Sequence, residues 1–274
     1  MRVFSIDAPG GRVSGFELGD GPPLVLIAGL GATCRIWGSL PELLGRQFRV
    51  IAVDNRGVGG SRAGEPFTLA GAANDLRAVL DDRGVARTAV FGASMGGLIA
   101  LLTALELPDR ISRVAVASAA AHLSTHGRRI LELVHDLLLY APPERIGADL
   151  MTLAFSPPFH ERFPGFVVET AALYGLDETD LPGTLLQVEH LLGGWDIRPQ
   201  LRSLEIPTLV FCGDRDPVIG VEDTLELAVS LPDAEIVRFP DGAHSLLAEG
   251  GETALDRLIP FLSGKTEPGG SAFV

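Results

Sequence analysis

The 274-residue sequence predicts an α/β domain built on a mostly parallel sheet, and three observations carry this prediction. Short, nearly continuous apolar runs, such as PPLVLIAG (residues 22–29) and RTAVFGAS (residues 87–94), are typical of strands buried on both faces. These runs alternate with helix-like segments, and parallel strands need such crossovers, which place helices on both faces of the sheet. From about residue 120 to 200 the strand rhythm stops, which indicates a helical insertion.

The elements follow one another along the chain. Residues 2–8 and 12–18 predict two short strands, and the Pro-Gly-Gly between them indicates an antiparallel hairpin. An amphipathic segment at residues 253–262 predicts the last helix. Six apolar runs predict the parallel strands: residues 22–29, 48–54, 87–94, 112–120, 207–214 and 234–240.

This order divides the chain into three parts. We expect a core formed by residues 1–119 and 201–264, with a helical lid at residues 120–200. Helical spacing inside the lid, as in residues 128–141, is interrupted by prolines. Residues 265–274 are rich in glycine and polar residues and predict a disordered tail.

Composition excludes several classes of protein. Twenty-two basic and 35 acidic residues give a net charge of −13, which argues against a nucleic-acid partner because that function needs a basic surface. No apolar run reaches the roughly 20 residues of a membrane span, and the N-terminus lacks a secretory signal, so we expect a cytoplasmic protein without membrane contact. Cys34 and Cys212 suggest neither a disulfide framework nor a metal site.

A serine lies between glycines at the end of a predicted strand. Residues 92–96, Gly-Ala-Ser-Met-Gly, match the G-x-S-x-G nucleophile elbow, in which a tight strand-to-helix turn lifts the serine hydroxyl out of the sheet. Glycines flank the serine because a Cβ there would collide with the neighbouring strand or helix. We therefore expect Ser94 to be a nucleophile.

A serine hydroxyl needs a general base and an orienting carboxylate, which follow it in the order acid, then histidine. Most histidines lie in the predicted lid, whereas His244 follows the last predicted strand and is our candidate base. Asp214 and Asp216 are both candidates for the acid, and we favour Asp216 because Asp214 lies closer to the strand end. A turn-forming role explains either aspartate as well.

The loop IAGLGAT, residues 27–33, follows the first parallel strand and predicts part of an oxyanion hole. Its glycines allow the Leu30 N–H to turn toward the site, where it would act together with the Met95 N–H. Trp37 and His122 are candidates for substrate contact, although Trp37 is equally suited to anchor its loop in the core.

With these residues placed, the chain resembles the α/β-hydrolase fold superfamily over nearly its whole length. The resemblance rests on GLGAT, DNRGVGGS, GASMGG, GDRDPV and GAH, in that order, with Ala28 where many relatives carry histidine. Within the superfamily it is similar to the small-lid group of 3-oxoadipate enol-lactonases, cofactor-free haloperoxidase-like esterases and meta-cleavage-product hydrolases. Ser94 argues against the haloalkane dehalogenases and epoxide hydrolases, which use an aspartate nucleophile.

The resemblance implies a serine hydrolase that acts on an apolar ester, lactone or ketone without a cofactor or metal. An ester or lactone is the expected substrate, and a carbon-carbon bond of a vinylogous diketone is the alternative. Arg128 and Arg129 are candidates to bind a substrate carboxylate, but a solvated helix start explains them more simply. A ligand-binding, receptor-like protein with slow turnover is the rival from another class, and the oligomeric state stays open.

Overall fold

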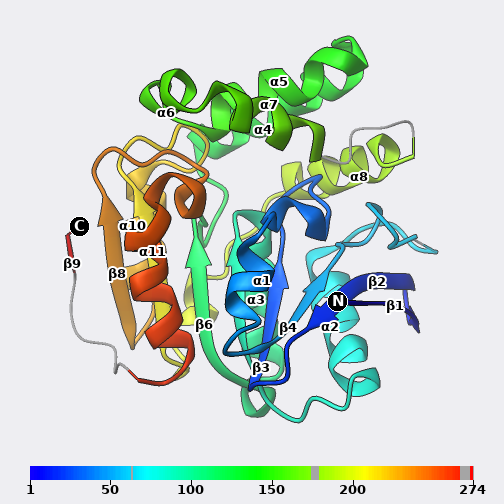
Figure 1. Ribbon diagram of the computed structural model, residues 1–274. Coiled ribbons are helices and arrows are strands. Elements are labelled where there is room, and N and C mark those ends of the chain that lie inside the picture. The colour runs from blue at the N-terminus through cyan, green and yellow to red at the C-terminus, as the bar shows by residue number, and fades with distance from the viewer. Residues whose placement is uncertain (63, 174–178, 266–271, 274) are drawn as a thin grey trace.

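The computed structural model describes residues 1–62, 64–173, 179–265 and 272–273. Its strands form one sheet in the order β1-β2-β4-β3-β5-β6-β7-β8-β9 (Figure 1). The strands are β1 (Arg2–Ala8), β2 (Gly11–Leu18), β3 (Pro23–Ile27), β4 (Arg49–Val53), β5 (Thr88–Ala93), β6 (Ile111–Ala117), β7 (Thr208–Gly213), β8 (Ala234–Phe239) and β9 (Ala272–Phe273).

The sheet is parallel except at its beginning. β1 pairs antiparallel with β2, and β2 pairs antiparallel with β4. The pairs from β3 through β9 are all parallel. This confirms the predicted hairpin and the mostly parallel sheet. The continuous apolar runs have a simple reason, since parallel strands are covered by helices on both faces.

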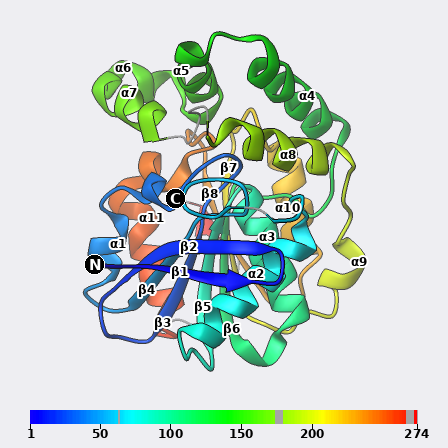
Figure 2. The same cartoon turned by 90° about the vertical axis from the view of Figure 1, so that its right-hand side faces the viewer.

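Helices pack on both faces of this sheet or, between β6 and β7, lie across the carboxyl ends of its strands. They are α1 (Leu40–Leu44), α2 (Leu69–Asp82), α3 (Met95–Glu106), α4 (Thr125–Tyr140), α5 (Pro143–Ala154), α6 (Pro157–Arg162), α7 (Pro164–Leu173), α8 (Leu181–Leu192), α9 (Arg198–Leu201), α10 (Val221–Val229) and α11 (Leu246–Leu262). Alternation along β3 shows how the faces divide. Val25 and Ile27 join a core with residues of α2, α3 and α10, while Leu24 and Leu26 join a second core with α1 and α11 (Figure 2).

The chain leaves the sheet after β6 and returns at β7. In between, α4 to α8 lie across the carboxyl ends of the parallel strands (Figure 1), where binding sites of such sheets form. Among the described residues, no helix has the length and apolar character needed to cross a membrane.

Two of the expected boundaries lie in the C-terminal part of the chain. The last helix begins at Leu246 rather than near residue 253, with a break at Gly251, whose φ is 50°. The predicted tail falls mostly outside the described residues. Within it, Ala272 and Phe273 pair in parallel with Val237 and Arg238 of β8.

Candidate active site

Ser94 lies at the sharp turn between β5 and α3. Its φ of 55° and ψ of −123° place it in a strained region for a residue with a side chain. A Cβ on Gly92 would collide with the Gly96 carbonyl, and a Cβ on Gly96 with the Ile27 carbonyl. The Ser94 N–H donates to the Ala117 carbonyl of β6 at 2.8 Å. The glycines of the motif are therefore required by close backbone approach.

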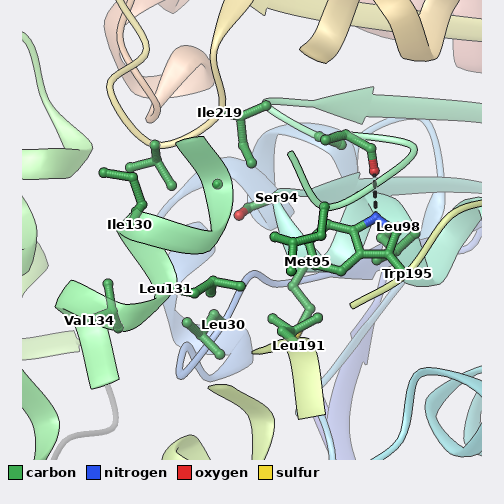
Figure 3. A pocket seen from close by; sticks show the side chains of 15 residues that line it. Leu30, Ser94, Met95, Leu98, Ile130, Leu131, Val134, Leu191, Trp195 and Ile219 are labelled. Atoms are coloured by element: carbon green, nitrogen blue, oxygen red, sulfur yellow. Dashed lines mark hydrogen bonds between the residues drawn. The ribbon is translucent and has the colours of Figure 1, made fainter. Parts of the chain in front are cut away.

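Ser94 lines a pocket whose walls include residues of α4 and α8 (Figure 3). The other lining side chains are apolar apart from the indole of Trp195, whose Nε1–H donates to the Ala120 carbonyl at 3.2 Å. Ser94 is thus the lining residue whose side chain offers a hydroxyl to a ligand. The lining residues are Leu30, Ser94, Met95, Leu98, Ala119, Ala120, Leu123, Gly127, Ile130, Leu131, Val134, Leu191, Trp195, Val218 and Ile219.

His244 and Asp216, 28 residues apart, meet between the loops that follow β8 and β7. The Nδ1 of His244 lies 2.9 Å and 3.1 Å from the two carboxylate oxygens of Asp216. The Asp216 side chain is 1% exposed and that of His244 is 14% exposed. Backbone N–H groups of Val218 and Ile219 donate to Asp216 Oδ1 at 2.8 Å and 2.9 Å, which fixes the carboxylate. With Nδ1 on the carboxylate, Nε2 is the ring nitrogen left for proton transfer.

The second candidate acid, Asp214, has a different partner. Its two carboxylate oxygens accept from the Arg238 guanidinium at 2.9 Å and 2.8 Å. Asp214 comes directly after β7, which ends at Gly213. Asp216 is therefore the aspartate of this loop that contacts His244.

Ser118, which the sequence analysis did not identify, connects the part of the site that holds Ser94 with the part that holds His244. It follows β6 with a φ of 52°, and its hydroxyl donates to the His244 carbonyl at 2.8 Å. Ala117, immediately before it, accepts the Ser94 N–H. The end of β6 thus holds the backbone of both the serine and the histidine. No motif marks Ser118, since the link depends on a left-handed backbone conformation that the sequence does not display.

The loop of residues 27–33 lies against Ser94. A Cβ built on Gly29 would lie 3.3 Å from Ser94 Cβ. The Leu30 N–H donates no hydrogen bond to any described residue. Met95 is the first residue of α3, so its N–H has no carbonyl one turn back in the helix. Both N–H groups expected for the oxyanion are available, and both residues line the pocket.

Neither of the two further side chains suggested for substrate contact lines this pocket. Trp37 packs on Phe91 beneath the sheet, with ring centroids 5.3 Å apart, and belongs to the core shared with α1 and α11. Trp195 is the tryptophan that contacts the pocket. The sequence did not single out Trp195, because no motif surrounds it.

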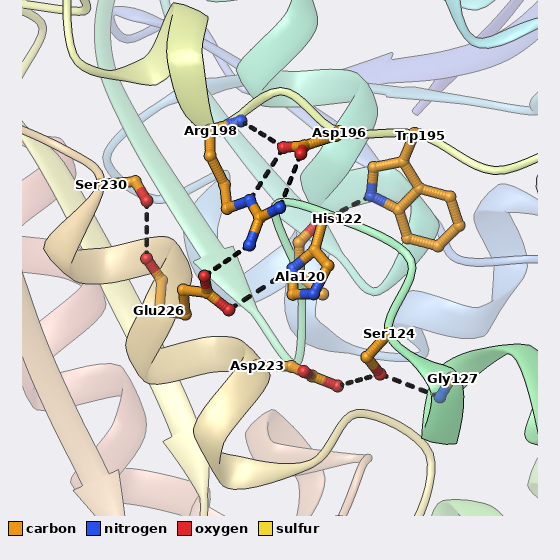
Figure 4. Close-up of polar contacts among 10 residues, drawn as sticks. All are labelled: Ala120, His122, Ser124, Gly127, Trp195, Asp196, Arg198, Asp223, Glu226 and Ser230. Carbon is orange, nitrogen blue, oxygen red and sulfur yellow. Dashed lines mark hydrogen bonds and ion pairs between the residues drawn. The ribbon is translucent and has the colours of Figure 1, made fainter.

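His122 lies outside the pocket, in a charged network between the start of the insertion and α10 (Figure 4). Its Nδ1 is 3.6 Å from Glu226 Oε2, and Glu226 Oε1 accepts from Arg198 at 2.6 Å. Hydrogen bonds from Arg198 lower the pKa of Asp196 to about 2. One ligand atom each from His122, Asp223 and Glu226 lie within 4.8 Å of one another, a spacing that could hold a cation. The Arg198 guanidinium already supplies positive charge to this network.

The two arginines suggested for a substrate carboxylate are also engaged elsewhere. Arg128 Nη1 donates to the Leu192 carbonyl at 2.7 Å. Arg129 is exposed and pairs with Glu132 at 2.7 Å. No charged side chain lines the pocket at Ser94 as the structure describes it.

Known proteins resemble the chain both in sequence and in structure. The family model of the alpha/beta hydrolase fold matches residues 22–141. A protein named "Putative carbamate hydrolase RutD" from Pseudomonas syringae pv. syringae is 30% identical over 230 residues, which cover 82% of this chain and 88% of that protein. A protein of the same name from Azorhizobium caulinodans is 29% identical over 251 residues, covering 89% and 92%.

Among solved structures, the enol-lactonase from Burkholderia xenovorans LB400 superposes with a TM-score of 0.86. The alignment covers 95% of this chain and 100% of that protein, at 24% sequence identity. The TM-score establishes the shared fold. The substrate depends on the side chains of the pocket, which the fold does not determine.

Proposed function

The chain belongs to the α/β-hydrolase superfamily, and on that premise we propose that it is a serine hydrolase of carboxylic esters or lactones. Ser94 is the nucleophile, His244 the general base and Asp216 the orienting acid of the proposed triad. The contact of His244 Nδ1 with the buried Asp216 carboxylate at 2.9 Å is the observation that carries the proposal. A buried carboxylate on Nδ1 selects the imidazole tautomer that leaves Nε2 free to accept a proton.

The reaction would follow the acyl-enzyme route. His244 Nε2 takes the proton of Ser94 as its oxygen attacks the substrate carbonyl, and Asp216 stabilises the imidazolium that forms. The N–H groups of Leu30 and Met95 donate to the oxyanion, and each such donor typically contributes about 10²- to 10³-fold in rate. The leaving alcohol takes its proton from His244. Water, activated in the same way, then releases the acid.

The pocket favours an uncharged acyl group with apolar surface. Its walls are aliphatic side chains together with the Trp195 ring. A carboxylate or carbamate anion placed there would lose its hydration without gaining a cationic partner, which is unfavourable. Although relatives carry the name carbamate hydrolase, the walls of this pocket favour a neutral ester or lactone.

The test is hydrolysis of p-nitrophenyl esters from acetate to decanoate by the purified protein and its Ser94→Ala variant. We expect turnover by the wild type and a loss of at least about 10³-fold in kcat for the variant. Equal thermal unfolding temperatures of the two proteins would show that the fold is intact. The acyl length at which kcat/KM peaks measures the pocket.

Two other outcomes would contradict the proposal. Cleavage of a vinylogous diketone by the wild type much faster than of any ester would assign it to the carbon-carbon hydrolases. Absence of turnover, together with a large ligand-induced rise in the unfolding temperature, would indicate a receptor-like role.

A further inference from the structure

Gln187, on the buried face of α8, bridges two loops of the core. Its side chain is fully buried. Oε1 accepts from the Gly31 N–H at 2.9 Å, and Nε2 donates to the Arg56 carbonyl at 3.0 Å. Because a backbone N–H can only donate and a carbonyl can only accept, these partners also fix which end of the amide is which. A helix of the insertion thus holds the loop that follows β3.

The bond from the Gly31 N–H to Gln187 restrains the Leu30–Gly31 peptide. This peptide adjoins the Gly29–Leu30 peptide, whose N–H is proposed to bind the oxyanion. Gly31 has a φ of 67°, which only glycine adopts freely, so its backbone is not restrained by a side chain of its own. A Cβ at this position would lie 2.8 Å from Thr184 Cγ2 of α8, so the loop and the helix are in close contact. Gln187 therefore fixes the orientation of the Gly31 N–H, which glycine, having no side chain, leaves free.

The Ala28–Gly29 peptide, on the other side of the Gly29–Leu30 peptide, is restrained as well. Asn55 Nδ2 donates to the Ala28 carbonyl at 2.8 Å. Between these two restraints lies the Gly29–Leu30 peptide, whose carbonyl accepts from the Ala32 N–H at 3.3 Å. In a trans peptide the N–H points opposite to the carbonyl. The Leu30 N–H is therefore held in one direction, with no hydrogen-bond acceptor among the described residues.

We propose that Gln187 is a positioning residue that orients the Leu30 N–H toward the oxyanion of the reaction. This inference rests on the proposed function, and it assigns a catalytic consequence to a residue of the insertion that touches no reacting atom. Other contacts already attach α8 to the core. His190 Nε2 accepts the Leu69 N–H at 3.1 Å, and Asp180 Oδ1 accepts the Gly59 N–H at 3.0 Å.

Replacement of Gln187 by leucine removes the restraint on Gly31 without reaching the pocket. We expect kcat to fall about tenfold to a hundredfold, because a donor that is displaced loses much of the effect of a donor that is aligned. KM should stay within about twofold, since the N–H acts on the transition state and not on the bound ester. Gln187→Glu keeps an oxygen that accepts the Gly31 N–H, and because burial favours the neutral carboxylic acid, its O–H can replace the Nε2–H donor to the Arg56 carbonyl. It should therefore retain kcat within about threefold of the wild type.

The experiment compares wild type, Gln187→Leu, Gln187→Glu and His190→Leu with the best p-nitrophenyl ester. His190→Leu is the matched control, because it removes another bond between α8 and the core, away from the oxyanion loop. A trifluoromethyl ketone with the same alkyl chain adds a second readout, since it forms a tetrahedral oxyanion adduct with the serine. Its inhibition constant should rise in Gln187→Leu in proportion to the loss of kcat/KM.

The outcomes distinguish a failure of the role assigned to Gln187 from a failure of the proposed hydrolase function. A fall in kcat confined to Gln187→Leu, with a matching rise in the inhibition constant, supports the inference. If Gln187→Leu and His190→Leu lose kcat equally and in step with their unfolding temperatures, Gln187 only attaches α8 and the inference is wrong. A wild type that neither hydrolyses esters nor binds the ketone overturns the proposed function as well. Should Gln187→Leu fail to fold, a Gln187→Glu protein with wild-type stability but tenfold lower kcat would also contradict the inference.

Discussion

The two sides of Ser94 are built in opposite ways. On the oxyanion side, residues 28–31, the groups proposed for chemistry are backbone N–H groups, and side chains from other elements hold that backbone in place. On the histidine side, residues 214–219 and 243–245, the groups proposed for chemistry are side chains, and backbone N–H groups hold the Asp216 carboxylate that contacts His244. The same kind of hydrogen bond is used in both places with the roles of backbone and side chain exchanged.

The difference explains which residues a sequence motif can reveal. A proposed acid or base must be a particular residue type, so it stands out in the chain. Almost any residue can supply an N–H, so the residues that orient it are the informative ones, and they lie far away. Gln187 is 156 positions from the Gly31 that it holds.

The largest effect should come from the acid on the histidine side. Asp216→Asn replaces the acceptor for His244 Nδ1 by an amide, and we expect kcat to fall by about 10⁴-fold, as for the corresponding change in a protease triad. Asp214→Asn is the matched control. It removes only the partly exposed pair with Arg238 and should leave kcat within about threefold. Ester kinetics of both variants check this, and a larger loss in Asp214→Asn would reverse the assignment.

A smaller effect is expected on the oxyanion side from Gly31→Ala. Gly31 and Gly38 both have positive φ, at 67° and 52°, so alanine strains the backbone and should reduce the stability at either position by about 1 to 3 kcal/mol. The Gly31 variant also meets Thr184, whereas a Cβ at Gly38 meets nothing within 4 Å. We expect a loss of about tenfold in kcat for Gly31→Ala alone.

Chemical denaturation and ester kinetics of the two glycine variants provide the measurement. Equal kcat for Gly31→Ala and Gly38→Ala would mean that the geometry of the loop at residues 28–31 does not control the rate. Side-chain restraint of this backbone would then contribute to stability and not to catalysis.

The sequence predicted the parallel sheet because burial on both faces requires continuous apolar strands, and this requirement is local. It predicted Asp216 next to His244 from their positions after β7 and β8, since the carboxyl ends of neighbouring parallel strands meet at one edge of the sheet. It did not predict Ser118 or Gln187. Their contributions depend on a positive φ in one case and on the docking of α8 in the other, and both arise from tertiary contacts.

Ser118 offers a moderate effect on the histidine side. Both Ser118→Ala and Ser118→Gly remove the hydroxyl that donates to the His244 carbonyl, so both should lower kcat about threefold to tenfold. Only glycine relieves the φ of 52°, so the alanine variant should be about 1 kcal/mol less stable than the glycine variant. Kinetics and urea unfolding of the pair separate the hydrogen bond from the backbone strain. Equal stability of the two variants would show that the strain is negligible.

The smallest effect concerns the attachment of α8 and is seen only in stability. Burial lowers the pKa of His190, and its Nε2 accepts the Leu69 N–H, a bond that the protonated ring cannot form. The unfolded chain therefore binds a proton more readily than the folded protein does. The stabilisation is complete above the unfolded value of about 6.5 and is lost as the pH falls toward the lower folded value. In His190→Leu this term is absent.

Thermal unfolding at about pH 7.5 and about pH 5 compares the wild type with His190→Leu. The difference in unfolding temperature between the two pH values should be larger for the wild type, because only it contains the titrating group. The same pH dependence in the two proteins would show that the His190 bond does not stabilise the docked α8.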